Sequence, residues 1–242
     1  MFDHLRRKIE SGEYSGRRRL PYVASLALEW ETTEDVVRAV LEDLAAADLV
    51  FIYDGPHGWP HARVRPVCTS DRTLRLDRTE RDAERGTFLT DAEMAGFAPR
   101  VGAPDVMFSE AGAWTAHVLN IPVGSEVTIR YRVYYADETP VQITQSYLPR
   151  ELTRGTAIEE EDTGAGGLYA RLEEAGHPLT RFTETVKVRR ATAAEVGQLQ
   201  LRPGVLLLAI LRTAYSGHRP VEVNNIALDP NWYGLSYDLP VS

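Results

Sequence analysis

The chain has 242 residues, 43% of them hydrophobic, which fits two modest domains of a soluble globular protein, and its net charge of −8 at pH 7 argues mildly against nucleic acid as the main partner. The longest apolar run, Val205–Leu211, is too short to span a bilayer, and the charged start of the chain has no signal-peptide pattern. Cys68 is the single cysteine, which excludes an internal disulfide framework and fits a reducing, cytoplasmic location without a membrane partner.

Three short helices are predicted near the N-terminus, at Leu5–Ser11, Tyr22–Glu29 and Thr33–Ala46. Thr32 followed by Asp35 is a capping-box pattern at the start of the third helix. Its buried stripe is predicted from the apolar residues at helical spacing, which are Val36, Val37, Val40, Leu41 and Leu44. Two short helices joined by a tight turn are the usual device that places the second helix in a DNA major groove.

A β-hairpin is predicted after these helices. Val50–Tyr53 and His61–Val64 have strand character, and Asp54-Gly55 is a strong turn signal between them. We interpret this hairpin as the wing of a winged helix-turn-helix. His57 and His61 lie four residues apart, but no third ligand at metal-binding spacing is near, so we expect a surface loop that touches a minor groove or solvent.

The charge of this N-terminal module is unusual for a DNA-binding domain. Residues 1–66 contain nine Lys/Arg and eleven Asp/Glu, whereas a DNA footprint is normally basic. Acidic residues at the start of the third helix can accept a hydrogen bond from cytosine N4, but they also repel the phosphates. The alternative is a module retained for packing or protein contact. The candidate DNA-binding residues are Arg17, Arg18, Arg19, Thr33, Glu34, Arg38, His57 and Arg63.

The polar, charge-alternating segment Pro66–Arg85 is typical of an interdomain connector. We therefore predict a winged helix-turn-helix over residues 1–66, a linker over 67–85 and a second domain over 86–242. The second domain has alternating strands and helices: hairpin strands over 125–135 with 140–147 and 205–215 with 221–228, a further strand over 182–190, a helix over 168–175 and a helix that begins with the capping box Thr192–Glu195. Consecutive hairpins with interposed helices indicate an antiparallel sheet in an α+β domain.

Strand alternation identifies a candidate pocket on one face of that sheet. The polar residues that share a face on three predicted strands are Arg130, Arg132 and Tyr134, then Thr144 and Ser146, then Glu222 and Asn224. If the face is concave, these groups would recognise an anion and hydroxyl groups. The alternative is a solvated outer face, and alternation alone does not decide between them.

The chain resembles a known family in several segments that occur in the right order. His4–Tyr14, Arg19-Leu20-Pro21 and Thr32–Leu49 resemble the winged helix-turn-helix of GntR-family transcription regulators. The segments Arg132–Pro149, Gly167–Leu172 and Arg219–Glu222 resemble the effector-binding UTRA domain of the HutC-type branch. The resemblance implies the chorismate-lyase-like fold for the second domain, which agrees with the predicted antiparallel α+β domain.

The resemblance also selects pocket residues. Arg132 matches an effector-binding arginine and Glu222 an acidic pocket residue, while Thr87 and Phe88 lie in a segment that often closes over ligand. Tyr134, Thr144 and Gly167 stand where the family often has an arginine, an acidic residue and a phosphate-binding serine, which favours a less charged or more aromatic effector than a sugar phosphate. The candidate ligand-binding residues are Thr87, Phe88, Arg132, Tyr134, Thr144, Gly167, Glu222 and Asn224.

The predicted function is a ligand-responsive transcriptional regulator that acts as a homodimer. Its partners would be double-stranded operator DNA and a small-molecule effector, and the resemblance implies repression relieved by ligand. No cofactor, metal or catalytic residue is predicted, because the histidines are scattered and no catalytic motif or phosphate loop is present. The alternative is a ligand-binding protein whose degenerate DNA module contacts another protein. An enzyme on the same fold would need turnover by the Arg132/Glu222 pocket.

Overall fold

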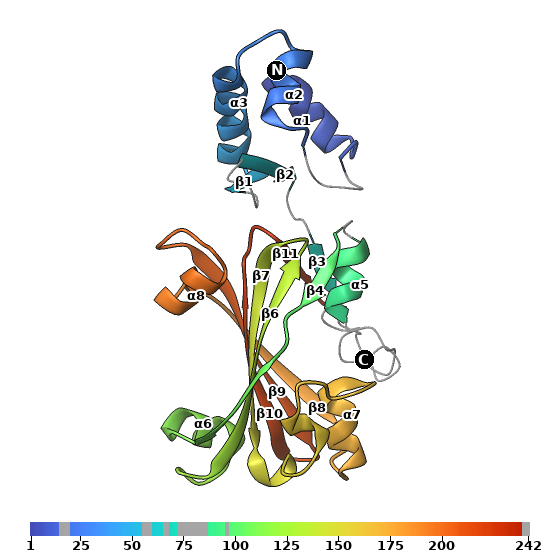
Figure 1. The fold of residues 1–242 in the computed structure, drawn as a ribbon, viewed down its shortest axis with the longest axis vertical. Helices are drawn as coiled ribbons and strands as arrows, with labels where there is room; N and C mark the ends of the chain where they lie inside the picture. The colour runs from blue at the N-terminus through green and yellow to red at the C-terminus, as the bar shows by residue number, and fades with distance from the viewer. Residues whose placement is uncertain (15–19, 55–59, 65–67, 72–86, 95–96, 239–242) are drawn as a thin grey trace.

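The computed structural model describes residues 1–14, 20–54, 60–64, 68–71, 87–94 and 97–238. The N-terminal part consists of α1 (Phe2–Glu10), α2 (Val23–Glu29), α3 (Glu34–Ala46) and the antiparallel hairpin of β1 (Val50–Asp54) and β2 (Pro60–Val64). These elements lie at one end of the long axis of the molecule (Figure 1). Their shared core includes Leu5, Leu26, Val37, Leu44 and Val50. The predicted winged helix-turn-helix is confirmed.

Two details of the third helix were predicted wrongly. The helix begins at Glu34, and its N-cap residue is Thr33, whose side chain makes no capping hydrogen bond. The pattern of Thr32 and Asp35 therefore does not form a capping box, because the helix starts one residue later than this pattern requires. Val36 is 47% exposed, although it was predicted in the buried stripe. Neighbouring residues on a helix point about 100° apart, and here Val37 takes the buried position.

The second part of the chain is built on an antiparallel sheet. Within the described residues its strands are β4 (Pro99–Val101), β5 (Asp105–Glu110), β6 (Glu126–Ala136), β7 (Thr139–Pro149), β8 (Arg181–Arg190), β9 (Leu206–Ser216) and β10 (Arg219–Leu228). They follow the order β4-β6-β7-β10-β9-β8, and β5 pairs with β6 beyond the end of β4. The predicted hairpins are β6–β7 and β9–β10, so the expected antiparallel α+β domain is confirmed.

Each face of the sheet is covered by two helices, one near each end, and the middle of the face lies between them. One face carries α5 (Thr87–Met94) and α7 (Gly167–Glu174), and the other carries α6 (Ala113–Leu119) and α8 (Ala193–Gln198) (Figure 1). Two short 3-10 helices, η2 (Arg150–Leu152) and η3 (Ala157–Glu159), follow β7. The capping box of Thr192 and Glu195 is present at the start of α8, as predicted.

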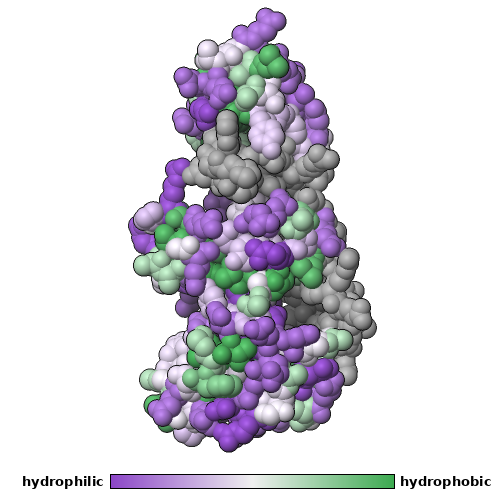
Figure 2. All heavy atoms as spheres, in the orientation of Figure 1, coloured by the Kyte–Doolittle hydropathy of each residue, from purple (hydrophilic) through white to green (hydrophobic). Residues whose placement is uncertain are grey.

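A second, small sheet joins the two ends of this domain. β3 (Cys68–Asp71) pairs in parallel with β11 (Tyr233–Ser236). β3 falls inside the range 67–85 that was predicted as a linker, so part of that range belongs to a sheet. No helix in the described ranges is long and apolar enough to cross a membrane. Figure 2 shows that, on the face in view, apolar side chains gather in small groups between hydrophilic ones.

Candidate functional site

A continuous row of polar side chains crosses the face of the sheet between α5 and α7. Residues that lie directly opposite each other on neighbouring strands point to the same face. The strand register places Arg130 opposite Ser146, Ser146 opposite Asn224, Asn224 opposite Arg212 and Arg212 opposite Glu184. We call these five residues the polar row. Apolar clusters lie on both sides of it on the same face, one under α5 and one under α7, and we call these two clusters the apolar walls.

The β6 end of the polar row carries two positive charges. Arg130 is 5% exposed, and its guanidinium donates to three backbone carbonyls, those of Ile158 (2.5 Å), Glu160 (2.5 Å) and Glu161 (3.1 Å). Arg132 lies two residues further on the same face and donates to the Glu161 carbonyl at 3.3 Å. Burial, together with the charge of Arg132, lowers the pKa of Arg130 to about 10, so it stays charged at neutral pH.

Neither arginine has a carboxylate at ion-pair distance among the residues that the structure describes. Carbonyl dipoles therefore hold the two guanidinium groups, Arg130 and Arg132, and no carboxylate of the described residues forms an ion pair with either of them. A buried uncompensated charge is costly, and a bound anion would remove that cost. The β6 end of the polar row has the charge expected of an anion subsite.

Glu222 lies next to the polar row and organises two hydroxyl groups. It is almost fully buried, and it accepts hydrogen bonds from Ser146 Oγ (2.6 Å) and Tyr169 OH (2.7 Å), one on each carboxylate oxygen. Burial raises the pKa of Glu222, while the two donors oppose that shift. Burial likewise raises the pKa of Tyr169. Each oxygen of the Glu222 carboxylate accepts one of these hydrogen bonds, so Glu222 orients both Ser146 and Tyr169.

The β8 end of the row is a buried ion pair. Arg212 Nε lies 2.8 Å from Glu184 Oε1, and the two side chains are only 9% and 7% exposed. Tyr237, just after β11, donates to the other oxygen of Glu184 at 3.0 Å. Burial by itself would lower the pKa of Arg212, but Tyr169 and Glu184 beside it raise that pKa overall. The two ends of the row thus differ, since the positive charge is compensated only at the β8 end.

Several buried polar side-chain atoms on the strands of this face have no hydrogen-bond partner among the residues that the structure describes. They are Arg132 Nε, Arg212 Nη2, Gln142 Oε1 and Asn224 Oδ1. A buried polar atom without a partner costs roughly 1–3 kcal/mol, and most such atoms in folded proteins are satisfied. Two donors and two acceptors left open on one face indicate a place where a polar ligand completes the hydrogen bonding.

The structure brings half of the predicted ligand-binding residues together. Arg132, Thr144, Glu222 and Asn224 share the face of the polar row, and Arg132 lies opposite Thr144. These positions agree with the predicted pocket, although their role as ligand contacts stays a prediction.

The other four predicted residues lie at the margins of this face. Phe88 packs edge-to-face on Tyr134, with ring centroids 5.0 Å apart, in the apolar wall under α5. Thr87 is the first residue of α5. Gly167 begins α7, two residues before Tyr169, and its φ of +67° is a conformation that favours glycine.

Five residues of the site were not selected from the sequence: Arg130, Ser146, Tyr169, Glu184 and Arg212. Alternation placed Arg130 and Ser146 on the correct face, so the sequence contained the signal needed to include them among the candidate ligand-binding residues. Arg212 interrupts an otherwise apolar strand, which is a usable signal for a buried charge. Its partner Glu184 could not be identified without the strand order, since the two are 28 residues apart.

The candidate DNA-binding surface is only partly within the described residues. Arg17, Arg18, Arg19 and His57 lie outside them, as does the side chain of Arg63, whose backbone is in β2. Thr33 is exposed as the N-cap of α3, and Glu34 and Arg38 form an ion pair of 2.9 Å on the first turns. Arg38 is the single cation of α3 and is already partnered by an acidic side chain.

We expect Glu34→Gln to raise the affinity of the protein for DNA. The substitution removes a negative charge that repels phosphate and that competes for the Arg38 guanidinium, so Arg38 becomes free to contact DNA. The gain in affinity should be larger for scrambled DNA than for a specific site, because the substitution changes only the electrostatic interaction with the phosphates, which does not depend on sequence. A fluorescence-anisotropy titration with both DNAs checks this, with Glu10→Gln on α1 as the control. A fall in affinity for the specific site alone would mean that Glu34 itself reads a base, and unchanged affinity for both DNAs would contradict the prediction.

The opposite face of the sheet holds an open cavity of about 680 Å³ between α6 and α8. Its floor includes Tyr131, Gln145 and Asn225, and its margins include Trp114 and Lys187. The ring of Trp114 packs on Tyr147, but its side chain remains 45% exposed. This cavity lies on the side of the sheet opposite the polar row.

The sequence profiles of two families match the two parts of the chain. The profile described as bacterial regulatory proteins, gntR family, matches residues 1–56, and that of the UTRA domain matches residues 106–232. The chain belongs to the GntR family of bacterial transcriptional regulators, in the branch that carries a UTRA ligand-binding domain. Proteins of this family are transcription regulators and not enzymes.

Individual relatives agree with this assignment. An uncharacterized HTH-type transcriptional regulator of Streptomyces coelicolor is 27% identical over 220 residues, which cover 87% of this chain and 80% of the relative. The crystal structure of PhnF from Mycobacterium smegmatis matches with a TM-score of 0.63 at 20% identity, over 100% of this chain and 99% of the other. The C-terminal domain of the histidine utilization repressor from Pseudomonas syringae matches with a TM-score of 0.53 at 23% identity, over 59% and 99% of the two chains.

Proposed function

We propose that this protein is a cytoplasmic repressor that binds double-stranded operator DNA through its winged helix and releases it when a small effector occupies the polar row. In this proposal residues 1–66 bind DNA and 86–242 bind the effector, while 67–85 connect the two and contribute β3 to the sheet with β11. The observation that carries the proposal is the set of unpartnered buried atoms on one face of the sheet, those of Arg132, Arg212, Gln142 and Asn224. These atoms are the hydrogen-bonding complement of a small polar molecule.

The effector that fits this face has one anionic group on an otherwise uncharged body. The uncompensated charge of Arg130 and Arg132 favours an anion at the β6 end, whereas Arg212 already has Glu184 as its counterion. The unpartnered Oδ1 of Asn224, between the β6 and β8 ends of the polar row, favours a neutral hydrogen-bond donor at that position of the effector. The apolar walls under α5 and α7 favour an aliphatic or aromatic body. A carboxylate with such a body fits these features better than a doubly charged sugar phosphate.

The test is a thermal-shift screen of monocarboxylates and sugar phosphates on the full-length protein. A carboxylate at about a hundred-fold excess over its Kd should raise the Tm by roughly 5 °C or more, because it binds only the folded state. We expect Arg132→Ala to abolish this shift. Arg100→Ala, which removes an exposed arginine stacked on Tyr135, is the matched control and should keep it.

The same ligand should weaken DNA binding in an anisotropy titration of the wild-type protein. A ligand that stabilises Arg132→Ala as strongly as the wild type would argue against a binding site at the polar row. Stabilisation by sugar phosphates alone would contradict the proposed class of effector but not the position of the site.

We also propose that the regulator is a homodimer, since a dimer places two winged helices on the two halves of a palindromic operator. The open face with Trp114 and Tyr131 at its cavity offers partly apolar area that a second copy can cover. Sedimentation velocity of the wild type and of Trp114→Glu tests this proposal. A dimer that the substitution converts to a monomer supports it, and a wild-type monomer at micromolar concentration argues against it.

A second function is favoured by the acidity of α3. Its first turn carries Glu34 and Asp35, and Arg38 is held by Glu34. In this alternative the module contacts another protein and no longer reads DNA. The two functions differ in salt dependence, because a DNA complex weakens steeply with salt as counterions are released from the phosphates.

A further inference from the structure

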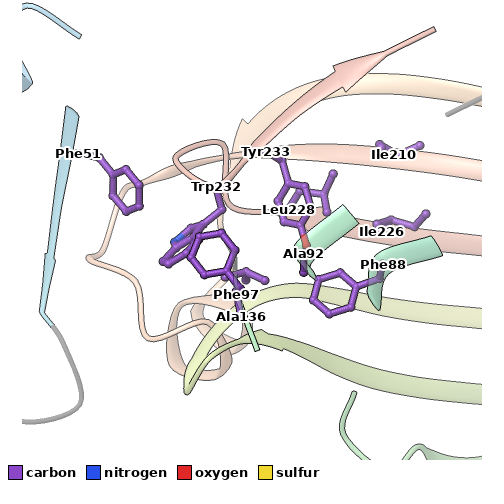
Figure 3. Packing of buried hydrophobic residues seen from close by; sticks show 11 residues of the cluster. Phe51, Phe88, Ala92, Phe97, Ala136, Ile210, Ile226, Leu228, Trp232 and Tyr233 are labelled. Atoms are coloured by element: carbon purple, nitrogen blue, oxygen red, sulfur yellow. The ribbon is translucent and has the colours of Figure 1, made fainter. Parts of the chain in front are cut away.

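Phe51 on the wing is buried although it points away from the core of its own domain. On β1 the neighbours Val50 and Ile52 pack into the winged-helix core, and alternation places Phe51 on the opposite side of the hairpin. It is nevertheless only 3% exposed. The cover comes from the effector domain, where the ring of Trp232 lies edge-to-face with Phe51, at a centroid distance of 5.2 Å (Figure 3).

The socket that receives Phe51 is itself aromatic and buried. Trp232 also contacts Phe97, with ring centroids 5.4 Å apart, and both side chains are buried. Figure 3 shows Phe97 and Trp232 close together on the side of the effector domain that faces Phe51. Edge-to-face aromatic pairs are directional, so the three rings fix an orientation as well as a distance.

Each ring of the socket is attached to an element that borders the polar row. Trp232 follows β10, the strand of Asn224, in a turn where its amide donates to the Asp229 carbonyl (3.0 Å). The Asp229 carboxylate holds the same turn by accepting from the backbone and side-chain nitrogens of Asn231 at 2.9 Å. Phe97 follows α5, and its amide donates to the Ala92 carbonyl (3.0 Å). A shift of β10 or of α5 therefore moves one side of the socket.

We propose that Phe51, Trp232 and Phe97 form an aromatic lock that holds the winged helix in one orientation on the effector domain. A ligand bound at the polar row can shift the wing through this lock. The rings of Trp232 and Phe97 follow β10 and α5, the strand and the helix that border the row. The lock supplies the discrete interdomain arrangement that an effector needs in order to change DNA affinity. This role in regulation rests on the proposed function, whereas the lock itself does not.

The first test measures the lock without DNA or effector. In a background where Trp30, Trp59 and Trp114 are replaced by phenylalanine, Trp232 is the single tryptophan of the full-length protein and is excited selectively at a wavelength where tyrosine does not absorb. Phe51→Ala should shift its emission to the red and raise its acrylamide quenching constant toward that of free tryptophan. Phe51→Leu keeps an apolar side chain and should give a smaller rise. Leu28→Ala, at an exposed position of the same domain, should leave the constant unchanged.

The second test measures the orientation of the domains. Spin labels at Leu28→Cys and Val123→Cys, in a Cys68→Ser background, report the interdomain distance from two exposed positions. A narrow distance distribution that broadens in Phe51→Ala supports the lock. Circular dichroism of each variant establishes that the helices are retained.

The lock is overturned if Phe51→Ala leaves both the quenching constant and the distance distribution unchanged, or if Leu28→Ala changes the quenching constant as much as Phe51→Ala does. Such a result would not contradict the proposed DNA binding or ligand binding, because neither DNA nor ligand is present in these measurements. Conversely, a protein that binds neither operator nor carboxylate would still show the lock, so failure of the two proposals can be told apart.

Discussion

Replacement of Arg212 by methionine is expected to lower the free energy of unfolding by about 3–5 kcal/mol, because it leaves the buried carboxylate of Glu184 without its counterion. The pair is 2.8 Å apart with both side chains less than a tenth exposed, so water cannot replace the lost partner. Methionine has a similar length, which limits the contribution of a cavity. Urea-induced unfolding at neutral pH, followed by circular dichroism, measures the change.

Two further variants separate the lost ion pair from other effects of the Arg212 substitution. Arg6→Met breaks the exposed ion pair with Glu10 on α1 and should leave the unfolding midpoint within error. Adding Glu184→Gln to Arg212→Met should restore part of the lost stability, because the uncompensated charge is then removed. If Arg212→Met alone lowers the free energy of unfolding by less than about 1 kcal/mol, the ion pair of Arg212 and Glu184 is hydrated, and this end of the polar row is not buried.

The second large effect is expected at Arg38. Its replacement by alanine should weaken operator binding roughly ten- to a hundred-fold, the range for the loss of an arginine that contacts a base edge. The loss should be severe here because Arg38 is the single cation of α3, and its removal leaves Glu34 and Asp35 facing the DNA. An anisotropy titration against the upstream region of its own gene measures the change.

Arg6→Ala is the control for the Arg38 variant, since it removes a cation of α1 that is also paired with a glutamate four residues away. It should weaken specific and scrambled DNA equally and only slightly. Equal weakening of the two DNAs by Arg38→Ala would show that Arg38 contacts phosphate and does not read sequence.

Hydrophobic patterns that continue over long segments of the sequence predicted most of the fold. The hairpins β6–β7 and β9–β10 follow from alternation over about ten residues on each strand, and the start of α8 follows from the local chemistry of Thr192 and Glu195. The short elements β5, α6 and β3 were not predicted. β5 is largely exposed and so lacks a clear apolar alternation, and β3 is defined by its pairing with β11, far away in the chain.

The candidate site could be predicted only as far as a single strand determines it. Alternation placed Arg132 and Thr144 on one face, but the row needs the order of five strands, which brings Arg212 beside Asn224 and Glu184 beside Arg212. Similarly, the sequence predicts Phe51 in the wing but not its burial, because the covering ring of Trp232 comes from the other end of the chain.

The most direct test of the regulator is a fluorescence-anisotropy titration of the wild-type protein against its own upstream region and against scrambled DNA, each at two salt concentrations. We expect a clear preference for the upstream region, a steep loss of affinity at higher salt, and release by the carboxylate that stabilises the wild type but not Arg132→Ala. Equal binding of both DNAs, or no binding at low salt, would contradict operator recognition and favour a protein partner for the acidic α3.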